Sequence, residues 1–559
     1  MRRVLSLVMV FLCVAGSAGA SSRFPGDSHR PIEDGPYSYM PPGEWSVGAF
    51  SWWLYIGLQW WDGTGRGADS VQITSLPYTM STSGTAATRK VYYLAGDLTS
   101  ASDGSTVSCD SCILNLQGHT ITFDNDAGGT AKGLYVSGGV DYFYAHSGTI
   151  TQWESPTEIL NGCYGGSTCD AIQLAGTLNW ITIRNVSGHV YGYNSACIDG
   201  DTYGTAHKAV QVLADPDSVA DFSNYSMAFS SRYTPESYAI KLSRPAASPD
   251  TFNYEVRNVN IMDAPHLGIA CGGWAEVVAC TVWIDQRNLD PAAGSGNAHA
   301  IADAGAMWAG SRIDSNLIRC GTTYYGGRGI YLNYGGGTEA RPISISWNDM
   351  VIHSGDPGNG DSPQARGIKF RWGPGWVSVI GNDITIELDD LVGTGYMWSG
   401  GHGMYVQSDY EQDGSCPMTP YRPMHHIVIK NNDIRIKWLG SRSWEYNTQA
   451  ACLVIQHLDS TVWDGYNDFN YCENNAYRTL TTAVVLSHDQ GCCSTDGDLE
   501  GWIFSSDTFI VPISAAKAVP DLPATMMAVM SGPNSLTMES PTRLATKISA
   551  PNCLSWTAA

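Results

Sequence analysis

One short unit recurs three times between Gly329 and Asp433, and it restricts the possible folds more than any other feature of the chain. Each copy begins with a glycine and a short apolar segment: Gly-Ile-Tyr-Leu at 329–332, Gly-Ile-Lys-Phe at 367–370 and Gly-Met-Tyr-Val at 403–406. After a loop of variable length, one or two alternating segments follow, bent at Asn-Asp or Asn-Asn-Asp. Such a unit cannot bury its apolar side chains alone, so neighbouring units must stack.

The apolar residues of each unit alternate with the period of a β-strand, so that one side chain points into a shared core and the next points outward. We expect the Asn and Asp residues at the bends to supply the left-handed backbone that a tight corner requires. The loops that leave the same edge of successive units would build the wall of a groove. These features predict an all-β fold, a right-handed parallel β-helix.

The pattern of glycine, paired strands and Asn corners in residues 90–512 resembles the pectate-lyase-like superfamily of right-handed parallel β-helix proteins. The phrase Asn-Leu-Gln-Gly-His-Thr-Ile at 115–121 is similar to the first full turn of many secreted β-helix proteins. This resemblance implies the fold, and it is weak for any one family.

The chain divides into four predicted segments. Residues 1–20 contain two arginines, an apolar run and a small-residue end, which predicts a secretory signal peptide. Residues 21–88, which include a Trp-rich block at 52–61, are expected to cap the first coil, or to form a sugar platform or assembly surface. Residues 89–512 form the predicted β-helix, and 513–559 a C-terminal cap or tail. Because no later apolar run could span a bilayer, we expect a secreted or cell-surface protein.

Of the 15 cysteines, only Cys13 lies in the predicted signal peptide. The even number that remains favours disulfides in an oxidising compartment, and Cys163 with Cys169 would close a loop. A zinc site at Cys109 and Cys112 is the alternative, but no second pair with metal spacing follows.

The formal net charge of −22 argues against nucleic acid as a partner, because phosphate binding requires a basic surface. It also disfavours a polyanionic substrate unless one groove is locally basic. Charged residues make up only 15% of the chain while Trp and Tyr are abundant, a composition that suits a secreted solenoid with aromatic binding surfaces.

Parallel strands in register place equivalent outward side chains above one another, so the positions after each unit's glycine predict a ladder of candidate substrate-binding residues. Its members are Lys241, Ser243, Tyr331, Asn333, Lys369, Arg371, Tyr405, Gln407, Gln456, His457 and His488. In the middle of the ladder, two cations lie between two tyrosines on consecutive units. Arginine can grip a carboxylate in a fork while tyrosine stacks on a sugar ring, which suits a uronate-containing chain.

A uronate lyase needs a base for the proton next to the carboxylate and a cation that neutralises the carboxylate. Lys369 is the predicted base, since nearby cations and burial can lower its pKa, and Arg371 is the predicted neutralising partner. The competing interpretation is that both are solvated residues on an exposed strand face.

A second constellation favours hydrolysis. Asp389-Asp390, Gly401-His402-Gly403 and Arg435-Ile436-Lys437 look like three signatures of the polygalacturonase family, in the family's order. The resemblance implies that Asp389 and Asp390 are acid/base carboxylates, His402 a supporting residue, and Arg435 with Lys437 substrate ligands. The family's upstream Asn-Thr-Asp signature is absent, and Arg435 and Lys437 would also face outward in a simple alternating strand.

No cofactor is required by the sequence. Asp199-Gly-Asp201 and Asp489 could bind Ca²⁺, or could simply form turns. The leading hypothesis is cleavage of an extracellular polysaccharide by β-elimination at a uronate, and the second is inverting hydrolysis of polygalacturonase type. A non-catalytic surface adhesin or self-assembling filament protein is the hypothesis from another class, because fold does not fix function.

Overall fold

The structure is a computed structural model. It describes residues 70–85, 89–123, 131–153, 169–176, 178–190, 195–200, 209–215, 218–224, 238–243, 253–264, 267–284, 298–321, 327–333, 335–354, 365–371, 375–388, 401–407, 425–439, 451–457, 470–478, 482–488, 502–505, 508–510, 536–537 and 554–556. The chain divides into two units, Met1–Trp61 and Asp62–Ala559. The first unit, with the predicted signal peptide and the Trp-rich block, lies outside the described residues.

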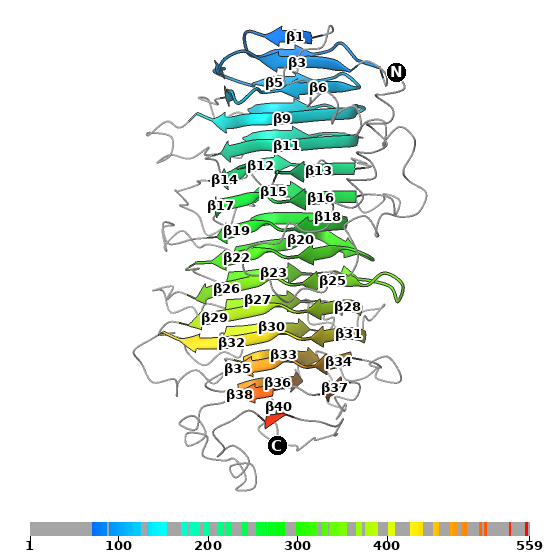
Figure 1. Ribbon diagram of the computed structural model, residues 1–559, viewed down its shortest axis with the longest axis vertical. Helices are drawn as coiled ribbons and strands as arrows, with labels where there is room; N and C mark the ends of the chain where they lie inside the picture. The colour runs from blue at the N-terminus through cyan, green and yellow to red at the C-terminus, as the bar shows by residue number, and fades with distance from the viewer. Residues whose placement is uncertain are drawn as a thin grey trace, which may run out of the picture. The chain divides into compact units, whose positions relative to one another are not determined.

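The second unit is a parallel β-helix in which each coil contributes strands to three columns (Figure 1). The first column stacks β2 (Tyr78–Met80), β5 (Ser105–Val107), β8 (Lys132–Val136), β10 (Asp170–Leu174), β12 (Ala196–Asp199), β15 (Tyr238–Leu242), the start of β18 (Leu267–Val278), the start of β20 (Ala298–Trp308), β23 (Gly327–Leu332), β27 (Ala365–Phe370), β30 (Gly401–Gln407), β33 (Ala451–His457) and β36 (Thr482–His488).

The second column stacks β1 (Ser70–Ile73), β3 (Lys90–Leu94), β6 (Cys112–Asn115), the starts of β9 (Asp141–Gln152) and β11 (Asn179–Val190), β13 (Ala209–Leu213), β16 (Asn253–Arg257), the end of β18, β21 (Arg312–Asp314), β25 (Ile343–Ser346), β28 (Gly375–Ile380), β31 (His425–Lys430), β34 (Asn470–Glu473) and β37 (Trp502–Ser505). A two-residue strand, β24 (Gly335–Gly336), pairs with the end of β20 and the start of β28.

The third column stacks β4 (Leu98–Thr99), β7 (Thr120–Phe123), the ends of β9 and β11, β14 (Asp221–Asn224), β17 (Asn260–Ala264), β19 (Thr281–Ile284), β22 (Leu317–Cys320), β26 (Asp349–Ser354), β29 (Asp383–Leu388), β32 (Asp433–Trp438), β35 (Ala476–Arg478) and β38 (Thr508–Ile510). The chain returns from the third column to the first in the right-handed sense that parallel connections adopt. The predicted right-handed parallel β-helix is therefore confirmed.

The ends of the helix differ in detail from the expected segments. Among the described residues, parallel pairing is already present at Ser70, where β1 joins β3, ahead of the expected start at residue 89. At the other end, β39 (Leu536–Thr537) and β40 (Leu554–Trp556) pair antiparallel with β38 and β36. Antiparallel strands at this position give the last coil a partner, as a cap does. In the part of the chain that the structure describes, no helix could cross a membrane.

Small residues at the corner that opens the first column allow the coils to stack. In β23, β27 and β30, the residues before and after the corner glycine pair with their equivalents on the next strand. The glycines themselves, Gly329, Gly367 and Gly403, do not pair. A Cβ atom on Gly367 would lie 2.4 Å from the carbonyl oxygen of Gly403 and 2.4 Å from Ile384 Cγ2. The corner residue therefore turns inward, and the residue before it and the second residue after it both face outward.

The corner between the second and third columns carries a buried asparagine on five consecutive coils: Asn316, Asn348, Asn382, Asn432 and Asn475. The residue that adopts the left-handed backbone is the one before the asparagine, for example Trp347 (φ 55°) and Gly381 (φ 68°). The expectation that Asn348 and Asn382 supply this conformation was wrong, because their side chains instead hydrogen-bond from coil to coil. In the third unit the expectation is confirmed, because Asn431 at the bend adopts the left-handed backbone (φ 56°).

The cysteines of the described residues are mostly core residues. Cys109 and Cys112 form a disulfide, which removes the zinc alternative at this pair. Free, buried thiols are found at Cys197, Cys271, Cys280, Cys320 and Cys452. Cys169 is also buried, but Cys163 lies outside the described residues, so their pairing stays a prediction.

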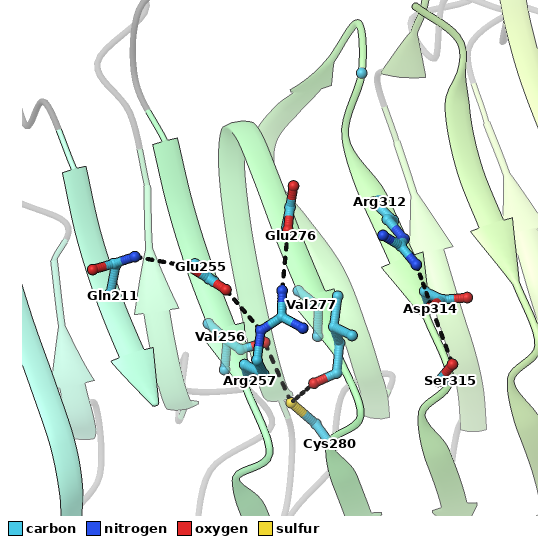
Figure 2. Close-up of polar contacts among 12 residues, drawn as sticks. Gln211, Glu255, Val256, Arg257, Glu276, Val277, Cys280, Arg312, Asp314 and Ser315 are labelled. Atoms are coloured by element: carbon cyan, nitrogen blue, oxygen red, sulfur yellow. Dashed lines mark hydrogen bonds and ion pairs between the residues drawn. The ribbon is translucent and has the colours of Figure 1, made fainter. Parts of the chain in front are cut away.

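A belt of charged residues crosses the outer face of the second column (Figure 2). Arg257 Nε donates to Glu255 at 2.7 Å and Arg257 Nη2 donates to Glu276 at 3.5 Å, while Gln211 Nε2 donates to the other oxygen of Glu255 at 2.8 Å. Burial and the neighbouring Glu255 raise the pKa of Glu276. Arg257 therefore separates two carboxylates that would otherwise repel each other.

Replacing Arg257 with methionine is expected to lower the free energy of unfolding by about 1–3 kcal/mol at neutral pH, because it leaves Glu255 and Glu276 partly buried without the cation between them. The loss should shrink as the pH falls and the carboxylates are protonated. Urea unfolding across pH measures it. Arg319→Met, which removes a more exposed pair with Asp349, should cost less than about 1 kcal/mol; equal losses in both variants would contradict the role given to Arg257.

Candidate functional site

Two files of outward side chains run along the first column, one on each side of its corner. The front file, immediately before the corner, aligns His299, Arg328, Arg366 and His402 on β20, β23, β27 and β30. The rear file, two residues after the corner, aligns Tyr331, Lys369 and Tyr405 on β23, β27 and β30. Because the strands are in register, each residue lies about 4.8 Å from its equivalent on the next coil.

The two files converge across the corner. The guanidinium of Arg328 lies 4.5 Å from the ring centre of Tyr331, and that of Arg366 lies 4.3 Å from the ring centre of Tyr405 on the next coil. Lys369 Nζ lies between the two rings, 5.5 Å from that of Tyr331 and 5.4 Å from that of Tyr405. We call Arg328, Tyr331, Arg366, Lys369, Arg371 and Tyr405 the basic cluster.

Three cations of the basic cluster, Arg328, Arg366 and Lys369, are buried, and no carboxylate among the described residues pairs with them. The exposed fractions of Arg328, Arg366 and Lys369 are 7%, 1% and 7%. Among the described residues, none of these three forms an ion pair with an acidic side chain. The Nε atoms of Arg328 and Arg366 are buried and have no hydrogen-bond partner. Burying unpaired charge is costly, so the cluster favours an anion that enters from outside.

Burial and mutual repulsion also shift the pKa values of these three cations. Burial, followed by repulsion from Arg366, Arg328 and Arg371, lowers the pKa of Lys369 well below its usual value. Burial and Arg366 lower the pKa of Arg328 to about 9, and burial lowers that of Arg366. Lys369 can therefore lose its proton much more easily than an ordinary lysine, which is the property required of a general base.

Neutral groups orient the cluster. Arg328 Nη1 lies 2.8 Å from Nε2 of His299, and because a guanidinium can only donate, Nε2 accepts the hydrogen bond. The hydroxyl of Tyr331 donates to Asn333 Oδ1 at 2.8 Å, and the backbone N–H of Asn333 donates to Asp303 at 2.9 Å. On the next coils, the His402 ring lies 5.3 Å from that of Tyr405.

Several ladder residues lie where the sequence analysis expected them. Tyr331, Lys369 and Tyr405 share one file. Arg371 contributes, after burial, Arg366 and Arg328, to the lowered pKa of Lys369, and its role as the neutralising partner stays a prediction. The competing interpretation of Lys369 as a solvated surface residue is wrong, because its side chain is buried. Gln407 is buried and aligns with Gln456.

Other predicted residues lie away from the cluster. Lys241 belongs to the same file but is separated from Tyr331 by Ala270 and Ala302. His457 and His488 align with each other on β33 and β36. Ser243, the ladder residue that directly follows β15, is buried.

The residues of the polygalacturonase-like signatures are not brought together in the described part of the chain. Only His402 lies on the first column, beside Arg366. Arg435 and Lys437 lie on β32 in the third column, where Arg435 pairs with Asp383 and Asp433, and Lys437 pairs with Glu387. Asp389 and Asp390 lie outside the described residues, so their role is not tested.

Sequence analysis missed His299, Arg328 and Arg366. Each one precedes a small corner residue, in Ala-His-Ala, Gly-Arg-Gly and Ala-Arg-Gly, just as His402 does in Gly-His-Gly. This recurrence could have been found in the sequence. It was missed because simple strand alternation assigns these positions to the core, whereas the inward turn of the corner residue directs them outward.

The described residues contain no group of three or more His, Cys, Asp or Glu side chains that could hold a metal ion. Of the residues considered for Ca²⁺, Asp199 is described, whereas Asp201 and Asp489 are not. The Ca²⁺ hypothesis therefore stays a prediction.

Comparisons with known proteins identify no family. No protein-family model matches the chain, and no curated protein matches it. Among solved structures, it is similar to the A-module of mannuronan C-5 epimerase AlgE6 from Azotobacter vinelandii, with 12% identity, a TM-score of 0.32 and coverage of 79% of this chain and 89% of that one.

Two further solved structures are similar. The periplasmic alginate epimerase AlgG, as a double mutant, has 9% identity and a TM-score of 0.25, with 76% of this chain and 78% of that one covered. The tailspike of E. coli bacteriophage HK620, in complex with a pentasaccharide, has 10% identity and a TM-score of 0.25, with 78% and 76% covered. Because these superpositions are poor, the fold is established by the strand pairing itself.

Proposed function

We propose that the protein acts on an acidic extracellular polysaccharide and cleaves it by β-elimination at a uronate residue. The observation that carries this proposal is the basic cluster, in which three buried cations have no carboxylate partner among the described residues, in a chain whose net charge is −22. A locally basic site is the condition under which such an acidic protein can bind a polyanion. The rings of Tyr331 and Tyr405 are buried against the cations and help to hold them in place.

The cluster contains the groups that elimination requires. Neutral Lys369 accepts the proton next to the uronate carboxylate, and the electron pair left behind forms a carbon–carbon double bond as the glycosidic oxygen departs. Arg366 and Arg371 neutralise the carboxylate, which acidifies that proton and stabilises the charge that develops. A tyrosine hydroxyl, from Tyr331 or Tyr405, lies within the cluster to protonate the leaving oxygen.

The two alternative functions, hydrolysis and a non-catalytic role, would require other features of the molecule. Hydrolysis of polygalacturonase type would use Asp389, Asp390, Arg435 and Lys437, and the last two are engaged with acidic neighbours on the third column. A non-catalytic adhesin or filament would not need a lysine whose pKa is depressed at the centre of the cluster. The basic cluster therefore supports elimination better than either alternative, since of the described residues in the hydrolase signatures only His402 lies beside it.

Arg366→Gln is expected to lower kcat/KM for elimination by roughly 10²–10³-fold, the effect of removing one preorganised charge-stabilising donor. Purified protein is incubated with polygalacturonate, polymannuronate, polyguluronate, hyaluronan and neutral glucan, and the unsaturated product is followed by its ultraviolet absorbance. Arg435→Gln is the matched control and should retain near wild-type activity. If Arg435→Gln loses activity and Arg366→Gln keeps it, the substrate lies on the third column and the proposal is overturned.

A further inference from the structure

Two neighbouring histidines at the start of β31, His425 and His426, bring their ring nitrogens together. Their Nδ1 atoms lie 3.1 Å apart, and their ring planes are nearly perpendicular, at 85°. Consecutive side chains of an extended strand point to opposite faces, so a regular strand would not produce this contact. The contact depends on the left-handed backbone of His426 (φ 53°), a conformation that few residues other than glycine adopt. The chain therefore uses an uncommon backbone conformation that places two imidazoles side by side.

Neighbouring residues hold the two rings. The ring of Trp376, on the preceding coil, stacks on that of His426, with 3.7 Å between the ring centres and 16° between the planes. His425 pairs with Gly375, and a Cβ atom on Gly375 would lie 2.4 Å from His425 Nε2. Glycine at this position therefore makes room for the His425 ring. Both histidines are only partly buried, so solvent can reach the pair.

Stacking at this corner does not by itself explain the pair. On β9 and β11, the same corner carries Tyr142 and Trp180, which also adopt the left-handed backbone (φ 61° and 60°) and stack with 6.5 Å between ring centres. The residues before them are an aspartate and an asparagine, which align with each other. One aromatic ring on each coil is therefore enough for stacking, and His425 adds a second nitrogen beside that of His426.

The separation of the two Nδ1 atoms suits a metal ion that both can bind. Zinc–nitrogen bonds are about 2.0–2.1 Å long, so two nitrogens of a tetrahedral site lie roughly 3.3–3.4 Å apart. The observed 3.1 Å is close to this separation. A metal ion binds neutral imidazole, and burial followed by the neighbouring His426 lowers the pKa of His425, which favours its neutral form.

We propose that His425 and His426 bind one divalent transition-metal ion, Zn²⁺ or Cu²⁺, through their Nδ1 atoms, with water at its remaining positions. In the structure, one ring donates its Nδ1–H to the other. Binding moves that hydrogen to Nε2 of the same ring, so both Nδ1 lone pairs bind the ion and no proton is released overall. Imidazole suits these ions, whereas Ca²⁺ and Mg²⁺ prefer oxygen ligands. The proposal does not depend on the elimination proposed at Lys369.

The test uses the metal ions alone as probes of the full-length, tag-free protein. Isothermal titration calorimetry with Zn²⁺ at neutral pH measures the affinity, and electron paramagnetic resonance of the Cu²⁺ form counts the nitrogen ligands, for which we expect two. His426→Asn should weaken binding by at least roughly 100-fold, since loss of even a residue that only supports a ligand costs about 10–100-fold. Asparagine tolerates the left-handed backbone, so this variant keeps the corner. His425→Gln should have the same effect.

Gly375→Ala tests the geometry, because it keeps both histidines but displaces the ring of His425, and it should weaken binding by roughly 10-fold or more. His353→Gln is the control, since His353 on β26 is also a partly buried histidine, and it should leave the affinity unchanged. Thermal unfolding without added metal shows whether each variant is folded. The inference is overturned if wild type and His426→Asn bind both ions equally, or if bound Cu²⁺ has fewer than two nitrogen ligands. Neither outcome affects the elimination proposed at Lys369.

Discussion

Replacing Lys369 with methionine should slow formation of the unsaturated product by roughly 10²–10⁴-fold, the range for loss of a general base. Methionine matches the length and burial of the lysine stem but cannot accept a proton. The change should appear mainly in kcat, because the arginines that bind the carboxylate remain. Initial rates across substrate concentration measure this separation.

The pH dependence gives this variant a second readout. Burial and three arginines lower the pKa of Lys369, so wild-type activity should rise with pH through this lowered value and reach its plateau well below pH 10.5. Lys369→Arg keeps the charge but holds its proton throughout this range, so it should be as inactive as Lys369→Met. If Lys369→Met stays partly active and its activity rises with pH as in wild type, another group is the base.

Lys369→Met should lower activity but should not lower stability. The lowered pKa means that the folded state disfavours charged Lys369, so wild type loses stability relative to Lys369→Met as the pH falls from about 10.5 to the folded pKa, and the difference is constant below it. Lys369→Met should therefore be at least as stable as wild type at neutral pH. Lys437→Met on the third column, where the lysine is 52% exposed, should change neither activity nor stability.

The central repeats in the sequence were sufficient to predict the fold and part of the site. Alternation in Gly-Ile-Lys-Phe at 367–370 correctly predicts that Lys369 faces outward and that Tyr331 and Tyr405 lie above and below it, because parallel register repeats once per coil. The rest of the cluster depends on the corner. At Gly367 the chain turns inward and breaks the period of two, so Arg366 faces outward at a position where alternation predicts core.

Short motifs were the weakest evidence because they carry no information about the column in which each residue lies. His402 and Arg435 are 33 positions apart in the sequence and occupy strands of the same coil, yet they lie on the first and third columns. In a solenoid, the column and the coil of each residue therefore identify a site better than its order in the chain.

The largest loss of stability is expected for Asn382→Leu, at the centre of the asparagine ladder. Asn382 Oδ1 accepts the backbone N–H of Asn348 at 3.0 Å and the side-chain N–H of Asn348 at 2.9 Å. Its Nδ2 donates to Asn432 at 2.9 Å and to the carbonyl of Ile345 at 3.1 Å. Leucine has a similar volume but removes these bonds and a longer one from Nδ2 to the carbonyl of Ile380 at 3.3 Å, and it leaves the buried N–H of Asn348 without its acceptor.

We expect Asn382→Leu to lower the free energy of unfolding by about 2–4 kcal/mol, because each buried polar group left unsatisfied costs about 1–3 kcal/mol. Urea unfolding measures the loss as a lower midpoint. Asn260→Leu is the control, since the side chain of Asn260 donates to Asp221 at 3.0 Å from a partly buried position, and it should cost about 1 kcal/mol. Because the ladder links five successive coils, its disruption should loosen the stacking that also fixes the spacing of Arg328, Arg366 and Lys369, so activity should fall with stability. Equal midpoints for the two variants would show that the coils are held by their apolar core alone.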